Sequence, residues 1–594
     1  MQPSPLDEYA TRRQAREIAA AARERTHIHL GNAKVAIFVA AVIYGGYAIG
    51  GDPSPIAFGI GAAVFVALSI WHEMVMRALA RARAAVTYYA DGIARIEDRW
   101  MRGTPSGERF RDRNHPYADD LDVFGPGSLF QLLSLCRTPM GEDRLAGWLL
   151  RPSPISAIRE RQARVSALRA HIDLRERIAV VNAGRTRSMH ADRLIAWAEA
   201  QRSLPPIRVV IIALALAFAA LLTLYLKGGP GIYVGGIAAI NIVMLAWLFK
   251  RCDAIAEHLS SATESAALDL LANVVTEIEA ESFGEPALVA MAKRLKGEHG
   301  NAASRGIARL ARISDWADSR HNVFLKLSEI PVLFTLQLAY AAEAWRHRYG
   351  SQLRDWVDAI GEMEALLSIA GYSYEHPAHP FAQIFEDTEP RFEAAEIAHP
   401  LLPSTAVSNL LALTHTPQVF IVSGSNMSGK STLMRTVGIN AVLALAGAPV
   451  RAHRLSLTPM AIGTCLRHTD SLQEHRSGFY TEALRIRAIC DLLDGPLPVL
   501  FLFDELLSGT NSKDRRVAAE GVVRTMLSRG AIGMVTTHDL SLTEIAAIFP
   551  QQVKNVHLQD KVESGKMSFD YKLRDGIITH SNALELMRMI GLQV

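Results

Sequence analysis

The sequence predicts a C-terminal α/β domain attached to a mainly α-helical region that contains two pairs of long apolar helices. In the last third of the chain, apolar runs at Val419–Ser423, Val499–Phe503 and Gly533–Thr537 each end in a polar motif. That pattern is typical of buried parallel strands with functional groups at their carboxyl ends. Upstream, Ala, Leu, Arg and Glu dominate Arg77–Gln201 and Cys252–Ala370 at helical spacing, which predicts long helices there.

Charge and cysteine content exclude several classes of protein. Lys and Arg number 63 against 60 Asp and Glu, a formal net charge of +3, so any contact with nucleic acid must be a local patch. The 594 residues are enough for several domains rather than one compact core. The four cysteines are Cys136, Cys252, Cys465 and Cys490. Their wide spacing argues against a disulfide framework or a structural zinc site and fits a reducing, cytosol-facing compartment.

Two pairs of apolar runs without a charged residue predict two transmembrane hairpins. The runs are Val35–Gly50 with Ile56–Trp71, and Val209–Leu226 with Ile232–Phe249. The runs of the second pair are close to the ~20 residues that cross a hydrocarbon layer of about 30 Å. The first pair is shorter and rich in glycine, so burial inside a large soluble core is the alternative interpretation.

Basic residues flank both predicted hairpins. They are Arg12, Arg13, Arg16, Arg23, Arg25, Arg77, Arg81 and Arg83 around the first, and Arg202, Arg208, Lys250 and Arg251 around the second. The positive-inside rule therefore predicts a multi-pass protein of the cell membrane, in contact with membrane lipid. Both termini and the C-terminal domain are expected in the cytoplasm.

Two other segments need an interpretation. An arginine-rich stretch after the first hairpin comprises Arg95, Arg99, Arg102, Arg109, Arg111 and Arg113. It can bind DNA phosphates or anionic lipid head groups, or it can form a solvated face of a helix and loop. The apolar run Val323–Ala342 is interrupted by Lys326, Glu329 and Pro331, so we expect a core helix there rather than a membrane span.

A phosphate-binding loop is predicted directly after the run Val419–Ser423. Its residues are Gly424, Ser425, Asn426, Met427, Ser428, Gly429, Lys430 and Ser431, followed by Thr432, and they match G-x-x-x-x-G-K-[ST] between a strand and a helix. Backbone amides of such a loop cradle phosphates. Lys430 is expected to neutralise the β- and γ-phosphate oxygens of ATP, and the Ser431 hydroxyl is expected to hold Mg²⁺.

Two further motifs supply the groups that ATP hydrolysis needs. Asp504 and Glu505 follow an apolar strand, so Asp504 is expected to reach the Mg²⁺ shell and Glu505 to polarise the attacking water. Without the upstream lysine, the same two carboxylates would indicate a solvated turn. His538 directly follows the run that ends at Thr537, a position near the γ-phosphate or its water. The predicted catalytic residues are therefore Glu505, Lys430 and His538, with ATP and Mg²⁺ as cofactors.

These motifs, in this order, resemble those of the MutS family of DNA mismatch-repair ATPases. GSNMSGKST at 424–432 resembles the family's GPNMGGKST, LFDELLSGTNSKD at 502–514 resembles its extended Walker B segment, and TTHDL at 536–540 resembles its histidine motif. Ser477–Glu482 is similar to the family's STFMxE element, and Asp470–Leu472 to the acidic-leucine element before it. Segments from Asp119 onward also look like the family's core domain, so the resemblance covers about 119–594 apart from the second hairpin.

The resemblance implies a MutS-type P-loop ATPase that works as a homodimer through its ATPase domains. The segment Ser508, Gly509, Thr510 and Asn511 would cap the ATP held by the partner subunit, which makes two composite sites. In ABC transporters and SMC proteins the corresponding loop precedes the Walker B strand, whereas here it follows that strand, as in MutS.

The N-terminal region departs from the family's pattern. Mismatch-reading members carry a Phe-x-Glu wedge in a G-x-F-Y-E context, and no such sequence occurs before the predicted core. The first hundred residues form a hairpin and basic helices instead. We therefore expect a membrane-anchored MutS-like protein that lacks the mismatch-recognition domain, with DNA as a candidate partner but without mismatch-specific binding.

The expected domain order follows from these segments. It is a basic N-terminal helix at 1–30, transmembrane hairpin 1 at 31–76, the first part of a helical core at 77–206, transmembrane hairpin 2 at 207–250, the second part of the core at 251–395 and the ATPase domain at 396–594. The expected function is an ATP-driven conformational switch at a membrane. The alternatives are a repair protein that clamps mismatched or branched DNA in an ATP-dependent manner, and an ATP-driven transporter, against which the absence of intramembrane charge argues.

Overall fold

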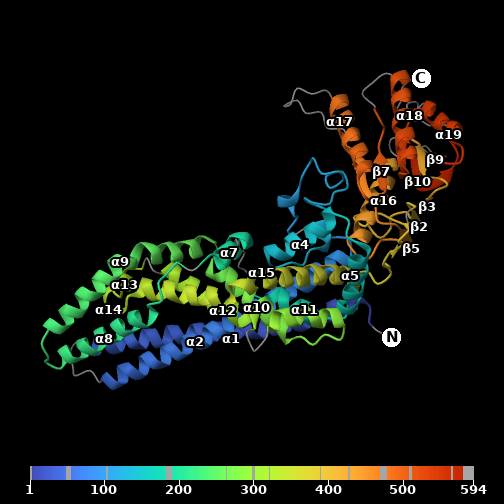
Figure 1. The fold of residues 1–594 in the computed structure, drawn as a ribbon. Helices are drawn as coiled ribbons and strands as arrows, with labels where there is room; N and C mark the ends of the chain where they lie inside the picture. The colour runs from blue at the N-terminus through green and yellow to red at the C-terminus, as the bar shows by residue number, and fades with distance from the viewer. Residues whose placement is uncertain are drawn as a thin grey trace. The chain divides into compact units, whose positions relative to one another are not determined.

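The fold is that of a computed structural model (Figure 1). It describes residues 3–48, 55–101, 105–181, 190–201, 203–262, 264–297, 302–319, 322–387, 389–425, 428–467, 478–507, 512–563 and 566–578. The chain forms two compact units. The first comprises Met1–Ile93, Cys136–Gly141 and His171–Glu364, and the second comprises Ala94–Leu135, Glu142–Ala170 and Ala365–Val594. The predicted combination of a mainly helical N-terminal region and a C-terminal α/β domain is confirmed.

The first unit is built from helices. They are α1 (Pro5–Ala48), most of α2 (Pro55–Ile96), α6 (Ile172–Val180), α7 (Ala191–Glu199), α8 (Arg208–Leu226), α9 (Ile232–Ala262), α10 (Ser265–Ala280), α11 (Pro286–Lys296), α12 (Ala303–Ser319), α13 (Val323–Lys326), α14 (Glu329–Val332) and the larger part of α15 (Phe334–Glu375).

Helices α1 and α2 run antiparallel and contact each other at several points. Near one end, Tyr9 is fully buried and its ring lies edge-on to Tyr89, with 5.5 Å between the ring centroids. Further along, His27 Nδ1 and His72 Nε2 are 2.7 Å apart. Residue numbers rise on one helix as they fall on the other, so these contacts fix the register of the pair.

Within the described part of the chain, four helices of the first unit are long and apolar enough to cross a membrane. They are Pro5–Tyr47, Ile56–Ile96, Arg208–Leu226 and Ile232–Ser261. The share of their most apolar window that is buried inside the protein is 6%, 0%, 6% and 17%, so most of these apolar side chains face outward. On α9, the buried positions Ile237, Asn241 and Leu248 recur at helical spacing and form the one face that packs on protein.

The prediction of a single core helix over Val323–Ala342 is wrong. Two four-residue helices, α13 and α14, precede α15 there, and Leu333 lies between them and α15 with a left-handed φ of 54°. A residue with left-handed backbone angles cannot continue a right-handed α-helix, so the helix is interrupted at Leu333. The turn contacts both α8 and α9, and the Asn241 side-chain amide donates a 2.8 Å hydrogen bond to the backbone oxygen of Ile330.

The second unit contains two sheets, arranged as β1-β5-β2-β3 and β10-β9-β4-β8-β7-β6. The smaller sheet consists of β1 (Gln383–Ile384), β2 (Phe392–Ile397), β3 (Asn409–Leu413) and β5 (Arg454–Leu457). The larger sheet consists of β4 (Val419–Ser423), β6 (Ala461–Cys465), β7 (Val499–Phe503), β8 (Ile532–Thr537), β9 (Val553–Glu563) and β10 (Lys566–Asp575). All neighbours in the larger sheet are parallel except the pair β9 and β10.

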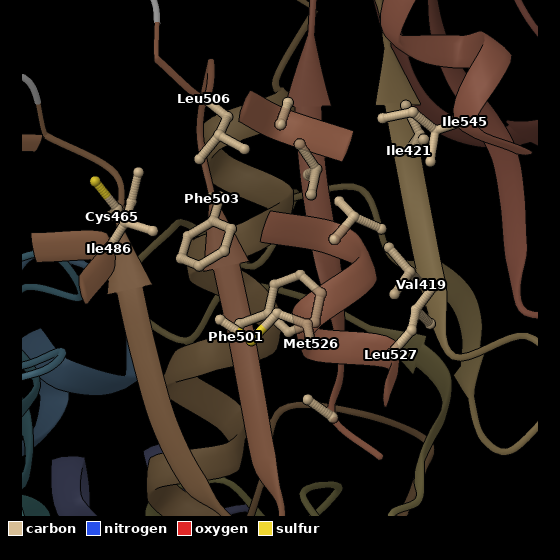
Figure 2. Close-up of a cluster of buried hydrophobic side chains, with 14 of the residues drawn as sticks. Val419, Ile421, Cys465, Ile486, Phe501, Phe503, Leu506, Met526, Leu527 and Ile545 are labelled. Atoms are coloured by element: carbon tan, nitrogen blue, oxygen red, sulfur yellow. The ribbon is translucent and has the colours of Figure 1, made fainter. Parts of the chain in front are cut away.

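Helices complete the second unit. They are η1 (Glu108–Phe110), α3 (Leu129–Leu133), most of α4 (Pro139–Leu150), α5 (Ile155–Leu168), α16 (Lys430–Leu445), α17 (Gly478–Asp491), η3 (Leu492–Asp494), α18 (Ser512–Ser528), η4 (Leu540–Glu544) and α19 (Ile545–Ile548). An apolar cluster on one face of the larger sheet includes Phe501 and Phe503 of β7 and Met526 of α18 (Figure 2). All five residues of β4 and all five of β7 are buried, as expected for strands covered on both faces.

Most of the arginine-rich stretch is held by carboxylates. Arg95 pairs with Glu375, Arg99 with Glu97, Arg109 with Glu142 and Asp143, and Arg111 with Asp119. Arg102 lies outside the described residues. The partners offset the charge of these four arginines, so they do not form a free basic face for DNA or lipid.

Candidate functional site

The predicted phosphate-binding loop connects β4 to α16. Gly424 and Gly429 have positive φ values of 154° and 92°, which glycine adopts most readily. A Cβ atom at Gly424 would lie 2.9 Å from the backbone oxygen of Leu558, so a side chain does not fit there. The loop therefore needs glycine at these two positions for its path. Asn426 and Met427 lie outside the described residues.

Lys430 is the first residue of α16 and is 3% exposed. Its ammonium group donates hydrogen bonds to the backbone oxygens of Gly424 at 2.8 Å and Ser425 at 2.7 Å. The Ser428 hydroxyl donates to the same Ser425 oxygen at 2.8 Å. The loop thus holds a buried positive charge at the start of a helix, where the helix dipole also favours an anion. Ser431 and Thr432 follow in the first turn of α16.

Asp504 and Glu505 leave the carboxyl end of β7, beside β8. Thr536 of β8 bridges them: its hydroxyl donates to Asp504 Oδ1 and accepts a 3.0 Å hydrogen bond from the Glu505 backbone N–H. Asp504 is 7% exposed, and its own N–H donates to the Cys465 oxygen of β6 at 2.9 Å. The backbone of Glu505 has a φ of 49°, a left-handed conformation that is costly for a residue with a side chain.

His538 directly follows β8 and faces Glu505. The distance from His538 Nδ1 to Glu505 Oε1 is 3.3 Å, and the two side chains are 48% and 24% exposed. The histidine can therefore orient the carboxylate, and both groups remain accessible to solvent. This pairing was not anticipated from the sequence, because the two residues are separated by more than one element of the fold.

Sheet topology brings the three motifs to one edge. In the order β4-β8-β7, the strand before His538 lies between the strand before the predicted phosphate-binding loop and the strand before Asp504. Ser423 is level with Thr537, and Phe503 is level with Val535. The carboxyl ends of adjacent parallel strands meet at a common crevice, which is the usual ligand site of such sheets.

Glu482 is a site residue whose role sequence reasoning missed. It is 6% exposed on α17, and its Oε1 accepts a 2.5 Å hydrogen bond from the Leu507 backbone N–H. The Leu507 backbone oxygen accepts a 3.2 Å hydrogen bond from Arg515 Nε of α18. The backbone of Leu507 is left-handed, with a φ of 57°. The backbone N–H and the backbone oxygen of Leu507, the residue before Ser508, are thus both hydrogen-bonded to side chains. In the sequence, Glu482 belongs to the element Ser477–Glu482, which resembles a family motif but does not indicate a contact with Leu507.

Several predicted residues fall outside the described part of the chain. They are Ser508, Gly509, Thr510 and Asn511 of the predicted capping segment, together with Asp470–Leu472 and Ser477. Their roles stay predictions.

The residues present fit a nucleotide with Mg²⁺. A Cβ at Gly424 would meet Ser428 Oγ at 2.7 Å and a Cβ at Gly429 would meet the Tyr571 ring at 3.0 Å, so glycine keeps the loop in this tight path, and Lys430 supplies a positive charge beside it. Mg²⁺ usually takes one or two protein ligands and completes its shell with phosphates and waters, so a dedicated cluster of carboxylates is not required. Among the described residues no group of three or more His, Cys, Asp or Glu is arranged for a metal.

Comparison with known proteins identifies the second unit's family. A family model described as MutS domain V matches residues 420–593. The chain is 31% identical over 203 residues to Endonuclease MutS2 of Thermus thermophilus, a match that covers 34% of this chain and 26% of that protein. It is 29% identical over 248 residues to DNA mismatch repair protein MutS of Natronomonas pharaonis, covering 40% of this chain and 28% of the relative.

A third relative is DNA mismatch repair protein MutS of Thermotoga petrophila, with 31% identity over 225 residues, 37% of this chain and 27% of the relative. The chain thus spans 26 to 28% of the length of these three proteins. The matched residues include the predicted phosphate-binding loop, Asp504 and His538, so the chain contains a C-terminal domain of the MutS domain V family.

Proposed function

We propose that this protein is a membrane-anchored, Mg²⁺-dependent ATPase in which ATP binding and hydrolysis drive a conformational switch. The observation that carries the proposal is the convergence of the loop after β4, His538 after β8 and Asp504–Glu505 after β7 at one edge of a parallel sheet. Membership of the MutS family supports ATP hydrolysis as the activity.

Each residue then has a separate task. The backbone amides of Gly424–Ser431 and the Lys430 ammonium would bind the phosphates, and in doing so Lys430 would exchange its bonds to the loop oxygens for bonds to phosphate. Ser431 and Asp504 would hold Mg²⁺, which neutralises the charge of the transferred phosphate. Glu505 would accept the proton of the attacking water, and His538, 3.3 Å from it, would keep that carboxylate in place.

A homodimer is part of the proposal. The segment Ser508–Asn511 would complete the site of the partner subunit, as in the motif order of the family. Its support here is the hydrogen bonding of Leu507, the residue before that segment, to Glu482 and Arg515.

Membrane anchoring rests on the four apolar helices. Their windows are 0 to 17% buried, so they do not form the interior of a soluble core within this chain. Exposed apolar surface of this extent needs a partner, and the basic residues that flank the helices favour a bilayer with the ATPase on the cytoplasmic side. Extraction of membranes with alkaline carbonate should leave the chain in the pellet, and its release into the supernatant would contradict anchoring.

The ATPase is tested with purified full-length protein, wild type against Glu505→Gln. The variant should bind ATP with wild-type affinity but lose hydrolysis by about 100-fold or more. Glu520→Gln is the matched control and should keep the wild-type rate. Glu520 is a carboxylate on α18 that, among the described residues, pairs only with the neighbouring Arg524. Equal rates for wild type and Glu505→Gln would overturn the proposed mechanism.

The second candidate function is DNA binding, which the names of the relatives favour. The same assay with mismatched, branched and single-stranded DNA separates the two. A DNA-dependent change in a Glu505-dependent rate indicates a membrane-tethered protein acting on DNA, whereas no change indicates a membrane or protein partner. Binding that weakens steeply with salt would support contacts to DNA phosphates.

A further inference from the structure

A cavity of about 620 Å³ lies in the first unit, between α7, α9 and α15. Its wall includes Arg193 and Trp197 of α7, Arg251 and His258 of α9, and Arg346 of α15. On each of α7 and α9 the lining residues recur every three or four positions, so one face of each helix forms the wall. We call this space the Arg193–Arg251 cavity.

The charge of the Arg193–Arg251 cavity is one-sided. Three arginines and one histidine line it, and none of its lining residues is Asp or Glu. Arg193 and Arg251 are exposed and form no ion pair within the described part of the chain. Glu199, which directly precedes the lining residue Ala200, is already paired with Arg354. Unopposed arginines in a concave site favour an anion, and a guanidinium suits phosphate in particular.

Buried donors in the wall also lack partners. Trp197 is 8% exposed, and its indole Nε1–H has no hydrogen-bond partner among the described residues. Arg346 is 9% exposed; it bonds Glu343 at 2.9 Å and backbone oxygens, yet its Nε is also without a partner. The Arg346 guanidinium lies 5.5 Å from the centroid of the Trp197 ring. Buried donors without partners are rare in folded proteins, and they are expected next to ligand sites.

The position of the cavity along α9 indicates the source of the anion. Ile232–Phe249 is the apolar part of α9, and at 1.5 Å per residue it spans about 27 Å, close to the thickness of the hydrocarbon layer. Arg251 comes two residues later, about 3 Å beyond that layer, where lipid head groups lie. Basic pockets at this level between membrane helices bind anionic head groups.

We propose that the Arg193–Arg251 cavity binds the phosphate of an anionic membrane lipid. Arg193 and Arg251 contact the phosphate, while Arg346 and Trp197 form the floor of the site. The inference deepens the proposed membrane anchoring and rests on it for the source of the ligand. A lipid bound there ties α7 and α9 together at the membrane surface, so the composition of the bilayer acts on the helices of the first unit.

The experiment titrates full-length protein in a neutral detergent with three ligands and follows thermal unfolding. The ligands are short-chain phosphatidylglycerol, phosphatidylcholine with the same chains, and glycerol phosphate without chains. Arg193→Gln/Arg251→Gln is compared with Arg305→Gln/Arg312→Gln, which removes two exposed arginines of α12 that have no ion-pair partner in the described residues. All four positions are at the surface, so the variants should fold.

Phosphatidylglycerol should stabilise wild type and the α12 control at concentrations about tenfold lower than phosphatidylcholine does, and the cavity variant should lose that preference. Equal half-saturating concentrations for the cavity variant and wild type would overturn the proposal. Glycerol phosphate acting at the same concentration as phosphatidylglycerol would overturn the lipid as the source, because the chains would contribute nothing. Since the titration is done in detergent, failure of anchoring appears separately, as release by carbonate.

Discussion

The carboxylate of Glu482 accepts a 2.5 Å hydrogen bond from the backbone N–H of Leu507, the last described residue before the predicted capping segment. The two residues lie on α17 and just beyond β7, and the contact is buried. It links α17, which lies in the sequence between the predicted phosphate-binding loop and Asp504, to the segment that would reach the partner subunit. A change at α17 can therefore alter the capping segment without touching the nucleotide.

Glu482→Ala should lower the ATPase kcat by about tenfold, equivalent to about 1.4 kcal/mol, while ATP affinity stays near that of wild type. The alanine leaves the Leu507 N–H buried without an acceptor. Glu482→Gln keeps an acceptor oxygen and should recover part of the rate. Steady-state kinetics and nucleotide binding measure the two effects, with Glu520→Ala of α18 as the control. A wild-type kcat for Glu482→Ala would show that the contact is not needed for turnover.

Thr536→Val should raise the Mg²⁺ concentration that supports half-maximal hydrolysis. The Thr536 hydroxyl donates to Asp504 and accepts from the Glu505 N–H, so valine, with nearly the same shape, removes both bonds. Each lost bond is worth about 1 kcal/mol. Thr536→Ser should restore the wild-type Mg²⁺ dependence, and Thr525→Val on α18 should not change it. An unaltered Mg²⁺ titration for Thr536→Val would argue against Asp504 as a ligand held by this threonine.

Glu364 should make the stability of the first unit depend on pH. Burial raises the pKa of this carboxyl group to about 7, although the Thr138 hydroxyl and the Arg137 N–H donate to it. The folded protein therefore holds the proton more tightly than the unfolded chain does. The associated stability is present below the unfolded pKa and is lost as pH rises toward 7, by up to about 3 kcal/mol.

In Glu364→Gln the side chain is neutral at every pH and keeps an acceptor oxygen. The variant should therefore not lose stability as pH rises toward 7. The unfolding temperature of the variant, relative to wild type, should rise between pH 5 and pH 8. Glu362→Gln, at a half-buried position on the same helix, provides the comparison. Parallel curves for Glu364→Gln and wild type across that pH range would contradict a carboxyl group that titrates near neutrality.

Arg95→Met should destabilise the second unit by about 3–5 kcal/mol. The Arg95 and Glu375 side chains are 5% and 1% exposed and share two hydrogen bonds of 2.6 and 2.7 Å, so the methionine would take this guanidinium away from a buried carboxylate. The double variant Arg95→Met/Glu375→Leu should recover most of the loss. Thermal unfolding of the full chain measures both. Arg524→Met, which breaks an exposed pair with Glu520, should have little effect.

Local patterns in the sequence predicted part of this fold well. The strands Val419–Ser423 and Val499–Phe503 are found with the predicted bounds, because runs of four and five consecutive apolar residues are typical of strands covered on both faces. The loop predicted to bind phosphate lies between β4 and α16, a strand and a helix as expected, and its glycines adopt conformations that few other residues allow.

Long-range contacts could not be predicted in this way. No local pattern indicates that Ala94–Leu135 folds with the C-terminal unit, or that Glu482 reaches the backbone of Leu507. The break at Leu333 was missed for a related reason. Its left-handed backbone depends on how the turn packs against α8 and α9, whereas the apolar composition of the segment alone favours a continuous helix.

The hydrogen bond from Asn241 to Ile330 determines when during synthesis α9 can reach its final packed state. Asn241 is fully buried near the middle of the apolar part of α9, and its acceptor lies 89 residues further along. If α9 enters a bilayer as it leaves the ribosome, its amide has no such acceptor in the lipid, which costs several kcal/mol. The helix therefore reaches its final hydrogen-bonded state only after the turn at α14 has been translated and has docked beside it.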